Sequence, residues 1–168
     1  MNKKVVVIGG GAAGLMCASF ISGSGRLVTV FEKNSSVKKL ETDKYFDNAY
    51  LGKKLLITGK GRCNLTNDCT NEEFLKNVPE NPKFLYSALK CFDTASVMKF
   101  FENNGCPVKT ERGNRVFPVS DKAKTVIDAL KAYAKDSGVR AVQDNVLSVK
   151  NTNDGFVLNL ERKGKIKV

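Results

Sequence analysis

Three glycines near the start of the chain have the spacing of a nucleotide-binding turn. They follow a β-branched run and precede a segment with helical spacing. In such a turn the first glycine allows a tight change of direction, the second lets a pyrophosphate approach the backbone, and the third lets the helix lie close to the sheet. The phosphates then bind free N–H groups at the positive end of the helix. The predicted phosphate-binding residues are Gly9, Gly11, Ala12, Ala13 and Gly14.

An acidic residue follows where a ribose-binding carboxylate is expected. The second apolar run, Leu27–Phe31, ends at Glu32. A carboxylate at the end of the second strand can accept hydrogen bonds from both hydroxyls of an adenosine ribose. Both NAD and FAD carry that ribose, so this motif alone leaves the two cofactors open.

A secretory signal is the main competing interpretation of the N-terminus. Residues 1–4 are basic, and residues 5–22 are mostly apolar, as in a signal peptide. Three successive glycines at positions 9–11 argue against it, because glycine is a poor helix former. The apolar run is also too short for a membrane span. We therefore expect a chain without a membrane partner.

A second glycine-rich segment carries charged and polar side chains. Glycines two residues apart permit close backbone approach to a flat or phosphorylated ligand. A lysine and an arginine supply positive charge, and an asparagine supplies an amide. The alternative is a tight turn around a buried cysteine. The residues of this second candidate site are Gly59, Lys60, Gly61, Arg62, Cys63 and Asn64.

The composition limits the chemistry that the side chains can do by themselves. The chain of 168 residues has no histidine, which removes the usual neutral-pH base and Ser-His-Asp or Cys-His nucleophile systems. Its five cysteines are irregularly spaced without a C-x-x-C pair, so we predict neither a metal site nor a disulfide framework. A reducing cytoplasm is the simplest setting, and a cofactor must supply most of the chemistry.

The net charge of +11 raises the question of nucleic acid, because a basic surface gains affinity for phosphates by releasing counterions. The lysines are scattered, with no arginine-rich run and no aromatic residues spaced as stacking platforms. We therefore predict a solvated basic surface and no nucleic-acid partner. A basic nucleic-acid-binding module remains the remote alternative.

The remaining pattern predicts an α/β fold. Residues 34–51 lack a clear period and read as an exposed loop with one short element. Asn81–Pro82 should start a helix whose Phe84 and Leu89 face the core, and Asp93 should cap the next helix, which ends at Asn104–Gly105. The later elements that we expect are a hairpin over Lys109–Val119, a helix over 121–137, a third parallel strand at Val139–Val142, and a β-meander over Val146–Val149, Phe156–Glu161 and Lys165–Val168.

Several segments in a shared order carry a family resemblance. They are GGGAAGLMCA, the pair Glu32–Lys33, GKKLLITGKGRCNLTN and GNRVFPVSDKA. With them the chain resembles the bacterial FAD-dependent oxidoreductases of the aminoacetone oxidase and bile-acid-pathway flavoprotein reductase type. The resemblance implies a Rossmann-like FAD/NAD(P)-binding domain with a parallel sheet and a β-meander.

The resemblance also implies roles for the candidate residues. Gly9, Gly11 and Gly14 would hold the FAD pyrophosphate, Glu32 the adenosine ribose with Lys33 nearby, and Val146 the adenine through its backbone. The segment Gly59–Asn64 would run along the flavin, with NAD(P)H as a possible electron donor.

Three residues of the second segment are catalytic candidates under this resemblance. Lys60 and Arg62 would favour negative charge on the reduced flavin. Cys63 is either redox-active or a packing residue, and the absence of a nearby second cysteine favours packing. Arg115 would face substrate or flavin, or lie on the surface.

Two departures from the family pattern change the expected extent of the domain. Most of residues 35–51 looks like an insertion. Residues 1–168 are predicted to form the N-terminal part of a single, truncated FAD-binding domain without the C-terminal FAD-binding segments or the substrate domain. The function that we expect is that of the FAD-binding portion of an oxidoreductase. The alternatives are a non-catalytic Rossmann-like remnant and an NAD-binding domain.

Overall fold

The computed structural model describes residues 4–35, 46–47 and 49–168. The chain divides into two compact units. The first comprises the residues up to Lys54 and those from Leu130 onward, and the second is Leu55–Ala129. The two glycine-rich motifs therefore belong to different units.

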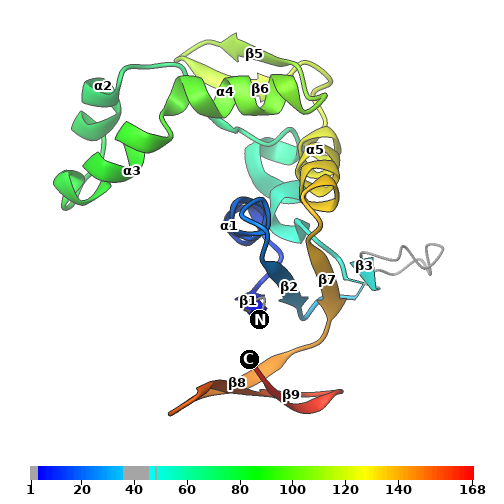
Figure 1. Ribbon diagram of the computed structural model, residues 1–168. Coiled ribbons are helices and arrows are strands. Elements are labelled where there is room, and N and C mark those ends of the chain that lie inside the picture. Colours follow the sequence, from blue (N-terminus) through cyan, green and yellow to red (C-terminus); the bar gives the residue numbers. More distant parts are fainter. Residues whose placement is uncertain (1–3, 36–45, 48) are drawn as a thin grey trace. The chain divides into compact units, whose positions relative to one another are not determined.

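A parallel sheet forms the centre of the first unit (Figure 1). Every neighbouring pair of its strands is parallel, and the strand order is β1 (Lys4–Ile8), β2 (Leu27–Glu32), β7 (Arg140–Gln143) and β3 (Phe46–Asp47). A hairpin cannot join parallel neighbours, so the chain passes from β1 to β2 through helix α1 (Ala12–Ser22). The predicted Rossmann-like arrangement and its third parallel strand are confirmed.

Helix α1 is anchored through buried small and aliphatic residues. Leu15 and Ala18 are fully buried. The Ser22 hydroxyl donates a hydrogen bond to the carbonyl oxygen of Ser137 over 2.6 Å. Ser137 directly follows helix α5 (Ala123–Asp136), which lies within the predicted 121–137. This bond ties the end of α1 to the chain just before β7.

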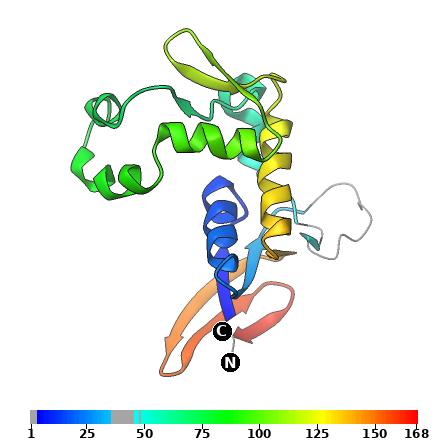
Figure 2. The ribbon, with the colours of Figure 1, turned by 45° about the horizontal axis from the view of Figure 1, so that its top comes forward.

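A β-meander covers one part of the parallel sheet (Figure 2). Phe31 of β2 packs with Leu158 and Leu160 in a buried cluster, and Val6 of β1 packs against it. The meander is antiparallel in the order β10-β9-β8, as predicted, and its strands are β8 (Val146–Thr152), β9 (Gly155–Leu160) and β10 (Gly164–Lys167).

A buried carboxylate, that of Asp144, links two parts of the meander. Asp144 is 1% exposed and accepts backbone N–H bonds from Asn145, Arg162 and Lys163 over 2.8 to 3.1 Å. These donors lower the pKa of Asp144 against the opposing effect of burial. The carboxylate therefore holds the β9–β10 turn beside the start of β8.

The second unit contains a small antiparallel sheet and several short helices. Its sheet has the order β4-β6-β5, from β4 (Thr66–Asn67), β6 (Arg115–Pro118) and β5 (Val108–Glu111). Gly113 and Asn114 turn the β5–β6 hairpin with φ of 76° and 56°, which confirms the predicted hairpin. Its helices include α2 (Asn71–Lys76), the 3₁₀ turn η2 (Pro82–Leu85), α3 (Tyr86–Cys91) and α4 (Thr94–Asn103). The 3₁₀ segment η1 (Lys53–Gly61) and α5 each contain residues of both units.

The helix predicted from Asn81 differs from the expectation. Asn81 adopts φ 49° and makes no side-chain cap, and the segment forms η2 followed by the six-residue α3. Leu89 is buried as predicted, but Phe84 is 84% exposed, so its assignment to the core is wrong. The short 3₁₀ turn changes the 3.6-residue period on which that assignment rested. The cap on α4 is confirmed, because Asp93 Oδ1 accepts the Ser96 N–H over 2.7 Å.

The segment predicted as an exposed loop is only partly described, since residues 36–45 and 48 lie outside the described residues. The predicted short element is present as β3, and Ser35 bridges to Ala49. The prediction that this segment is exposed is wrong at its end, where Ala49 is 7% and Leu51 is 2% exposed. Whether residues 35–51 are an insertion stays a prediction.

Among the helices of the described residues, none combines the length and the apolar character that a membrane crossing requires.

Candidate functional site

The first glycine turn adopts a backbone that requires glycine at two positions. Gly9 has φ 99°, and its N–H donates to the carbonyl oxygen of Phe31 over 2.8 Å. A methyl group at Gly14 would lie only 1.9 Å from the carbonyl oxygen of Gly9. The predicted backbone roles of Gly9 and Gly14, a tight turn and a close helix approach, are confirmed.

The middle of this turn is open. Gly11 precedes α1 with φ −80°, and no atom of the described residues lies within 4 Å of the place where its Cβ would stand. The first-turn N–H groups at Ala12 and Ala13 have no intrahelical acceptor, and no side chain of the described residues caps the N-terminus of α1. This open cradle of N–H groups has the geometry that a pyrophosphate needs.

The Glu32 carboxylate lies beside the turn. Glu32 is 7% exposed, and its Oε2 accepts the Gly10 N–H over 2.8 Å. Its Oε1 accepts the backbone N–H and the side-chain amide of Asn34. The structure therefore brings the glycine turn and the predicted ribose carboxylate together. The neighbouring Lys33 is exposed, and its carbonyl oxygen accepts from the Gln143 amide over 3.0 Å.

A returning segment, Tyr50–Lys53, holds both parts of this site. The Gly52 N–H donates to the carbonyl oxygen of Gly10 over 2.8 Å, and the Tyr50 N–H donates to that of Asn34 over 2.9 Å. Leu51 fills the space at Gly10, where a methyl group would lie 2.4 Å from Leu51 Cδ2. Sequence reasoning missed Gly10 and this segment because their partners are distant in the sequence. It missed Asn34, only two residues from Glu32, because spacing does not show where an amide side chain points. The only local signal was the third adjacent glycine.

Val146 lies at the start of the meander. It packs against the cluster of Phe31, Leu158 and Leu160 and is partly buried. Its backbone contact with an adenine stays a prediction.

The second glycine turn, in the other unit, is filled by its own neighbours. Gly59, Lys60, Gly61 and Cys63 all have positive φ, from 53° to 85°. A methyl group at Gly59 would lie 2.8 Å from the Asn64 nitrogen and 3.0 Å from the Phe117 ring. Lys60 and Cys63 hold this conformation without being glycine, which costs energy that the surrounding contacts must offset.

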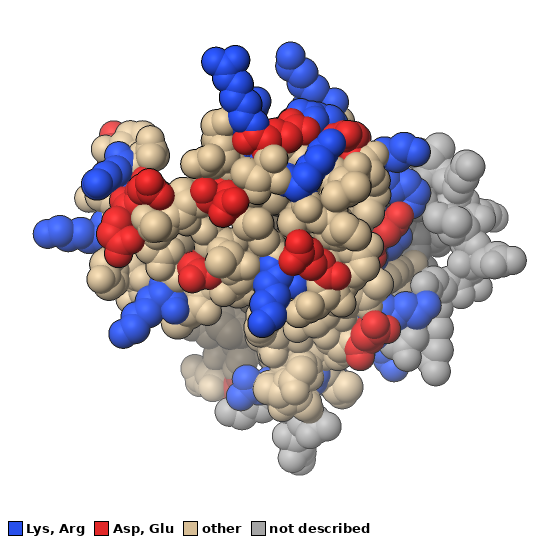
Figure 3. Space-filling view, turned by 90° about the horizontal axis from the view of Figure 1, so that it is seen from above, with Lys and Arg blue, Asp and Glu red and all other residues tan. Residues whose placement is uncertain are grey.

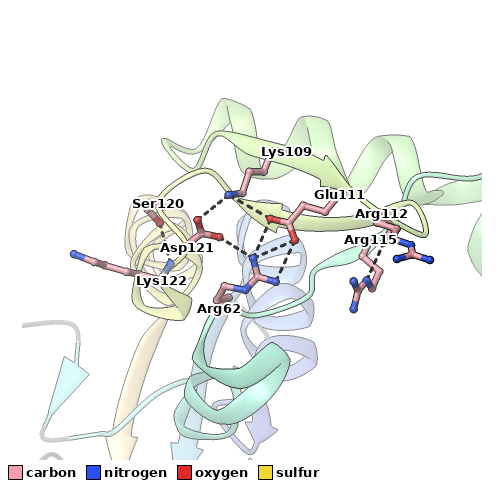
Figure 4. A network of polar contacts seen from close by, with 8 residues as sticks. All are labelled: Arg62, Lys109, Glu111, Arg112, Arg115, Ser120, Asp121 and Lys122. Carbon is pink, nitrogen blue, oxygen red and sulfur yellow. Dashed lines mark hydrogen bonds and ion pairs between the residues drawn. The ribbon is translucent and has the colours of Figure 1, made fainter.

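Arg62 joins a network of four charged side chains (Figure 4). Its guanidinium donates to both Glu111 oxygens over 2.9 and 3.1 Å and to Asp121 over 3.1 Å. Lys109 lies 2.7 Å from Asp121 and 3.3 Å from Glu111. The guanidinium carbon of Arg62 lies over the ring of Phe117, 4.0 Å from the ring centroid. Two cations and two carboxylates thus balance one another.

The charges of this network reinforce their own ionised forms. The hydrogen bond from Arg62 lowers the pKa of Glu111, and the one from Lys109 lowers that of Asp121. The bond to Glu111 raises the pKa of Arg62. Glu111 and Asp121 were not among the residues singled out from the sequence, since isolated acids carry no local signal of pairing. The proposed action of Arg62 on a flavin stays a prediction, but its charge is already paired with two carboxylates.

Cys63 is 2% exposed. Burial raises the pKa of its thiol, which keeps it protonated near neutral pH and disfavours nucleophilic or redox chemistry. This supports the packing role.

The Lys60 side chain, unlike the buried Cys63 thiol, is exposed.

Two further polar side chains serve the small sheet. With its amide nitrogen facing them, Asn64 donates to the carbonyl oxygens of Thr66 and Val116 over 3.0 and 3.1 Å. Arg115 is exposed and donates through Nε to the carbonyl oxygen of Arg112 over 3.1 Å, as in the surface alternative. The approach of Gly59–Asn64 to a cofactor held in the first unit stays a prediction.

No group of three or more His, Cys, Asp or Glu side chains is placed to hold a metal ion within the described part of the chain. On the face shown in Figure 3, Lys and Arg side chains are interspersed with Asp and Glu.

Curated proteins of known function resemble the chain over most of its length. The 3-dehydro-bile acid delta(4,6)-reductase of Clostridium scindens is 30% identical over 162 residues, covering 95% of this chain and 36% of that protein. The ribosomal RNA dihydrouridine synthase of Escherichia coli is 28% identical over 156 residues, covering 92% of this chain and 35% of that protein. The chain thus spans about a third of the length of these relatives.

Solved structures share the fold. Thermovibrio ammonificans THI4 matches with a TM-score of 0.57 at 12% identity, covering 99% of this chain and 54% of the other. The aromatic hydroxylase CabE of angucycline biosynthesis matches with a TM-score of 0.53 at 16% identity, covering 100% and 29%. The model of the HI0933-like protein Rossmann domain matches residues 3–168. This match confirms the resemblance stated from the sequence, and the chain belongs to the HI0933-like family of Rossmann domains.

Proposed function

We propose that this chain is the FAD-binding portion of a flavoprotein oxidoreductase. The observation that carries the proposal is the open turn at Gly11 with the Glu32 carboxylate fixed beside it. Membership of the HI0933-like family supports FAD as the dinucleotide.

The residues of the first unit have separate tasks in this proposal. The N–H groups at the start of α1 bind the pyrophosphate, and Gly11 leaves room for its approach. Glu32 accepts a hydrogen bond from the adenosine ribose. When bound, FAD supplies a ring system that takes up and releases a hydride or electrons. Lys60 and Arg62 remain our candidates for stabilising negative charge on that ring system.

The direct test is cofactor retention. The purified chain is mixed with FAD, passed through gel filtration, and its visible absorption is recorded. A retained flavin band with quenched fluorescence supports the proposal. A colourless protein that binds NAD⁺ in calorimetry favours the NAD-binding domain instead, and one that binds neither favours the non-catalytic remnant.

A substitution at Gly11 separates binding from folding. Aspartate fits the open space and the extended φ of −80°, and it is a favourable N-cap residue. We expect Gly11→Asp to keep or raise the free energy of unfolding. Its carboxylate faces the pyrophosphate, so FAD affinity should fall on the order of 100-fold.

Two controls accompany this variant. Gly11→Asn has nearly the same size without the charge and should weaken FAD less. Gly23→Ala, at the other end of α1, adds a methyl group with ordinary 3.5 Å contacts and should leave FAD affinity unchanged. Unaltered FAD binding by Gly11→Asp would contradict the proposed phosphate position.

The substrate is proposed from the relatives. The 30% identical relative is a bile-acid reductase, so a small molecule is our first candidate. The net charge of +11, together with a 28% identical ribosomal RNA dihydrouridine synthase, favours ribosomal RNA as the second. The test is the salt dependence of binding to a ribosomal RNA fragment: a slope of log K against log salt near zero favours the small molecule, whereas a steep slope of about −3 or beyond favours RNA.

A cytoplasmic location and the absence of a membrane partner belong to the same proposal. They are tested by fractionation of cells that express the chain: recovery in the membrane fraction would contradict them.

A further inference from the structure

We propose that Asn34 and Lys53 are positioning residues, because of which the Glu32 carboxylate binds one hydroxyl of the adenosine ribose rather than two. This inference rests on the proposed function and adds the selectivity of its ribose site. It concerns residues of the first unit only.

The contacts of Glu32 show how its acceptor capacity is divided. A carboxylate has about four lone-pair sites, two on each oxygen. Oε1 accepts the Asn34 backbone N–H over 2.8 Å and also the Asn34 amide nitrogen. Among the described residues, the one donor to Oε2 is the Gly10 N–H, over 2.8 Å. The described residues therefore fill Oε1 and leave one place on Oε2 for a ligand hydroxyl.

The Asn34 side chain is fixed in the orientation that fills Oε1. Its Oδ1 accepts a hydrogen bond from Lys53 Nζ over 3.2 Å, so its nitrogen is the atom turned to the carboxylate. Its backbone oxygen accepts the Tyr50 N–H over 2.9 Å. The amide thus lies between an ammonium and a carboxylate, and each charged group favours the same amide orientation.

The experiment uses three ligands that share the adenosine part of FAD. The dissociation constants of ADP, 2′-deoxy-ADP and 3′-deoxy-ADP are measured by calorimetry. We expect one deoxy analogue to bind at least about tenfold more weakly than ADP, the loss expected for one hydrogen bond to a charged group. The other analogue should stay within about threefold of ADP, because its missing hydroxyl has no free acceptor on Glu32.

Removal of the amide should abolish this asymmetry. In Asn34→Ala, Oε1 becomes available to the second hydroxyl, so the two deoxy analogues should differ by less than about threefold. A general loss of structure would weaken all three ligands together and leave their ratio unchanged. Retention of the wild-type ratio in an Asn34→Ala variant that binds ADP as tightly as the wild type, or equal losses with both analogues in the wild type, overturns the inference.

A second variant keeps the test valid if Asn34→Ala does not fold. Lys53→Met removes the ammonium that fixes the amide but keeps an exposed side chain of similar length, and the ratio between the analogues should shrink at least about twofold. Its matched control is Lys54→Met at the next exposed position, which should behave as the wild type. An unchanged ratio in Lys53→Met overturns the inference when Asn34→Ala does not fold, and otherwise shows that Lys53 is not a positioning residue.

The proposed function fails separately from this inference. If the wild-type chain binds neither FAD nor ADP, both fall. If it binds FAD and ADP but treats the two deoxy analogues alike, FAD binding stands and only the one-hydroxyl inference is overturned.

Discussion

The two glycine-rich turns of this chain contain similar residues but have different surroundings. In the first, a Cβ at Gly11 would meet no described atom within 4 Å, and α1 begins there without a cap from any side chain that the structure describes. In the second, a Cβ at Gly59 would meet Asn64 and Phe117, and the guanidinium of Arg62 is shared by two carboxylates. The first turn leaves backbone N–H donors available to a ligand, whereas the donors of Arg62 in the second turn are already bound to carboxylates of the protein.

This difference separates ligand binding from local structure. Both turns contain glycines with positive φ, Gly9 in the first and Gly59 in the second, so composition alone does not distinguish them. The distinguishing feature is what occupies the space beside the backbone. An open site with free N–H groups favours an anionic ligand, whereas paired charges on an aromatic ring hold a hairpin and a turn together.

The largest expected effect comes from Gly14→Ala. Its methyl group would lie 1.9 Å from the carbonyl oxygen of Gly9, which neither backbone segment can avoid without shifting. We expect a loss of about 3 kcal/mol in the free energy of unfolding, measured by urea denaturation. Gly11→Asp, only three residues away, should show no such loss. Equal destabilisation by both would remove the contrast within the first turn.

Gly59→Ala should have the next largest effect. It combines φ 53° with a contact of 2.8 Å to the Asn64 nitrogen, so we expect a loss of about 2 kcal/mol in the free energy of unfolding. Gly61→Ala is the control, because its nearest neighbour would be 3.8 Å away and only its φ of 85° is unfavourable. The second turn is less tightly filled than described if both variants unfold alike.

The smallest expected effect concerns the charge network, and it depends on pH. The ordinary pKa values of Glu111 and Asp121 are 4.5 and 3.8, and both are lowered in the folded chain. Their contribution to the free energy of unfolding is therefore fully present above about pH 5 and is lost as the pH falls through their lowered pKa values. Arg62→Met should lower the unfolding midpoint at pH 7, and this difference from the wild type should shrink at acid pH.

Arg115→Met is the matched control for the network. Arg115 also lies over Phe117, at 5.9 Å, but its bond is to the backbone of Arg112. Its substitution should change the midpoint little at any pH. A difference between Arg62→Met and the wild type that stays constant down to acid pH would show that Phe117, rather than the carboxylates, carries the effect.

Much of the first unit could be predicted because its signals are local. The strand residues of β1 and β2, the glycine spacing before α1 and the acid at the end of β2 all lie within residues 4–32. The β5–β6 hairpin and the cap at Asp93 follow from turn and capping residues in the same way. The helix at Asn81 failed because a 3₁₀ turn broke the period, which left Phe84 exposed.

The sequence by itself determined the Rossmann-like order of elements and the positions of the two glycine turns, since backbone conformation and hydrophobic period are properties of neighbouring residues. Only the tertiary structure decided that Asn34 fills one oxygen of Glu32, that Leu51 closes the space at Gly10, and that Glu111 and Asp121 pair with Arg62. These contacts join residues up to 59 positions apart. The physical reason is that a hydrogen bond or an ion pair depends on distance in space, which no spacing along the chain specifies.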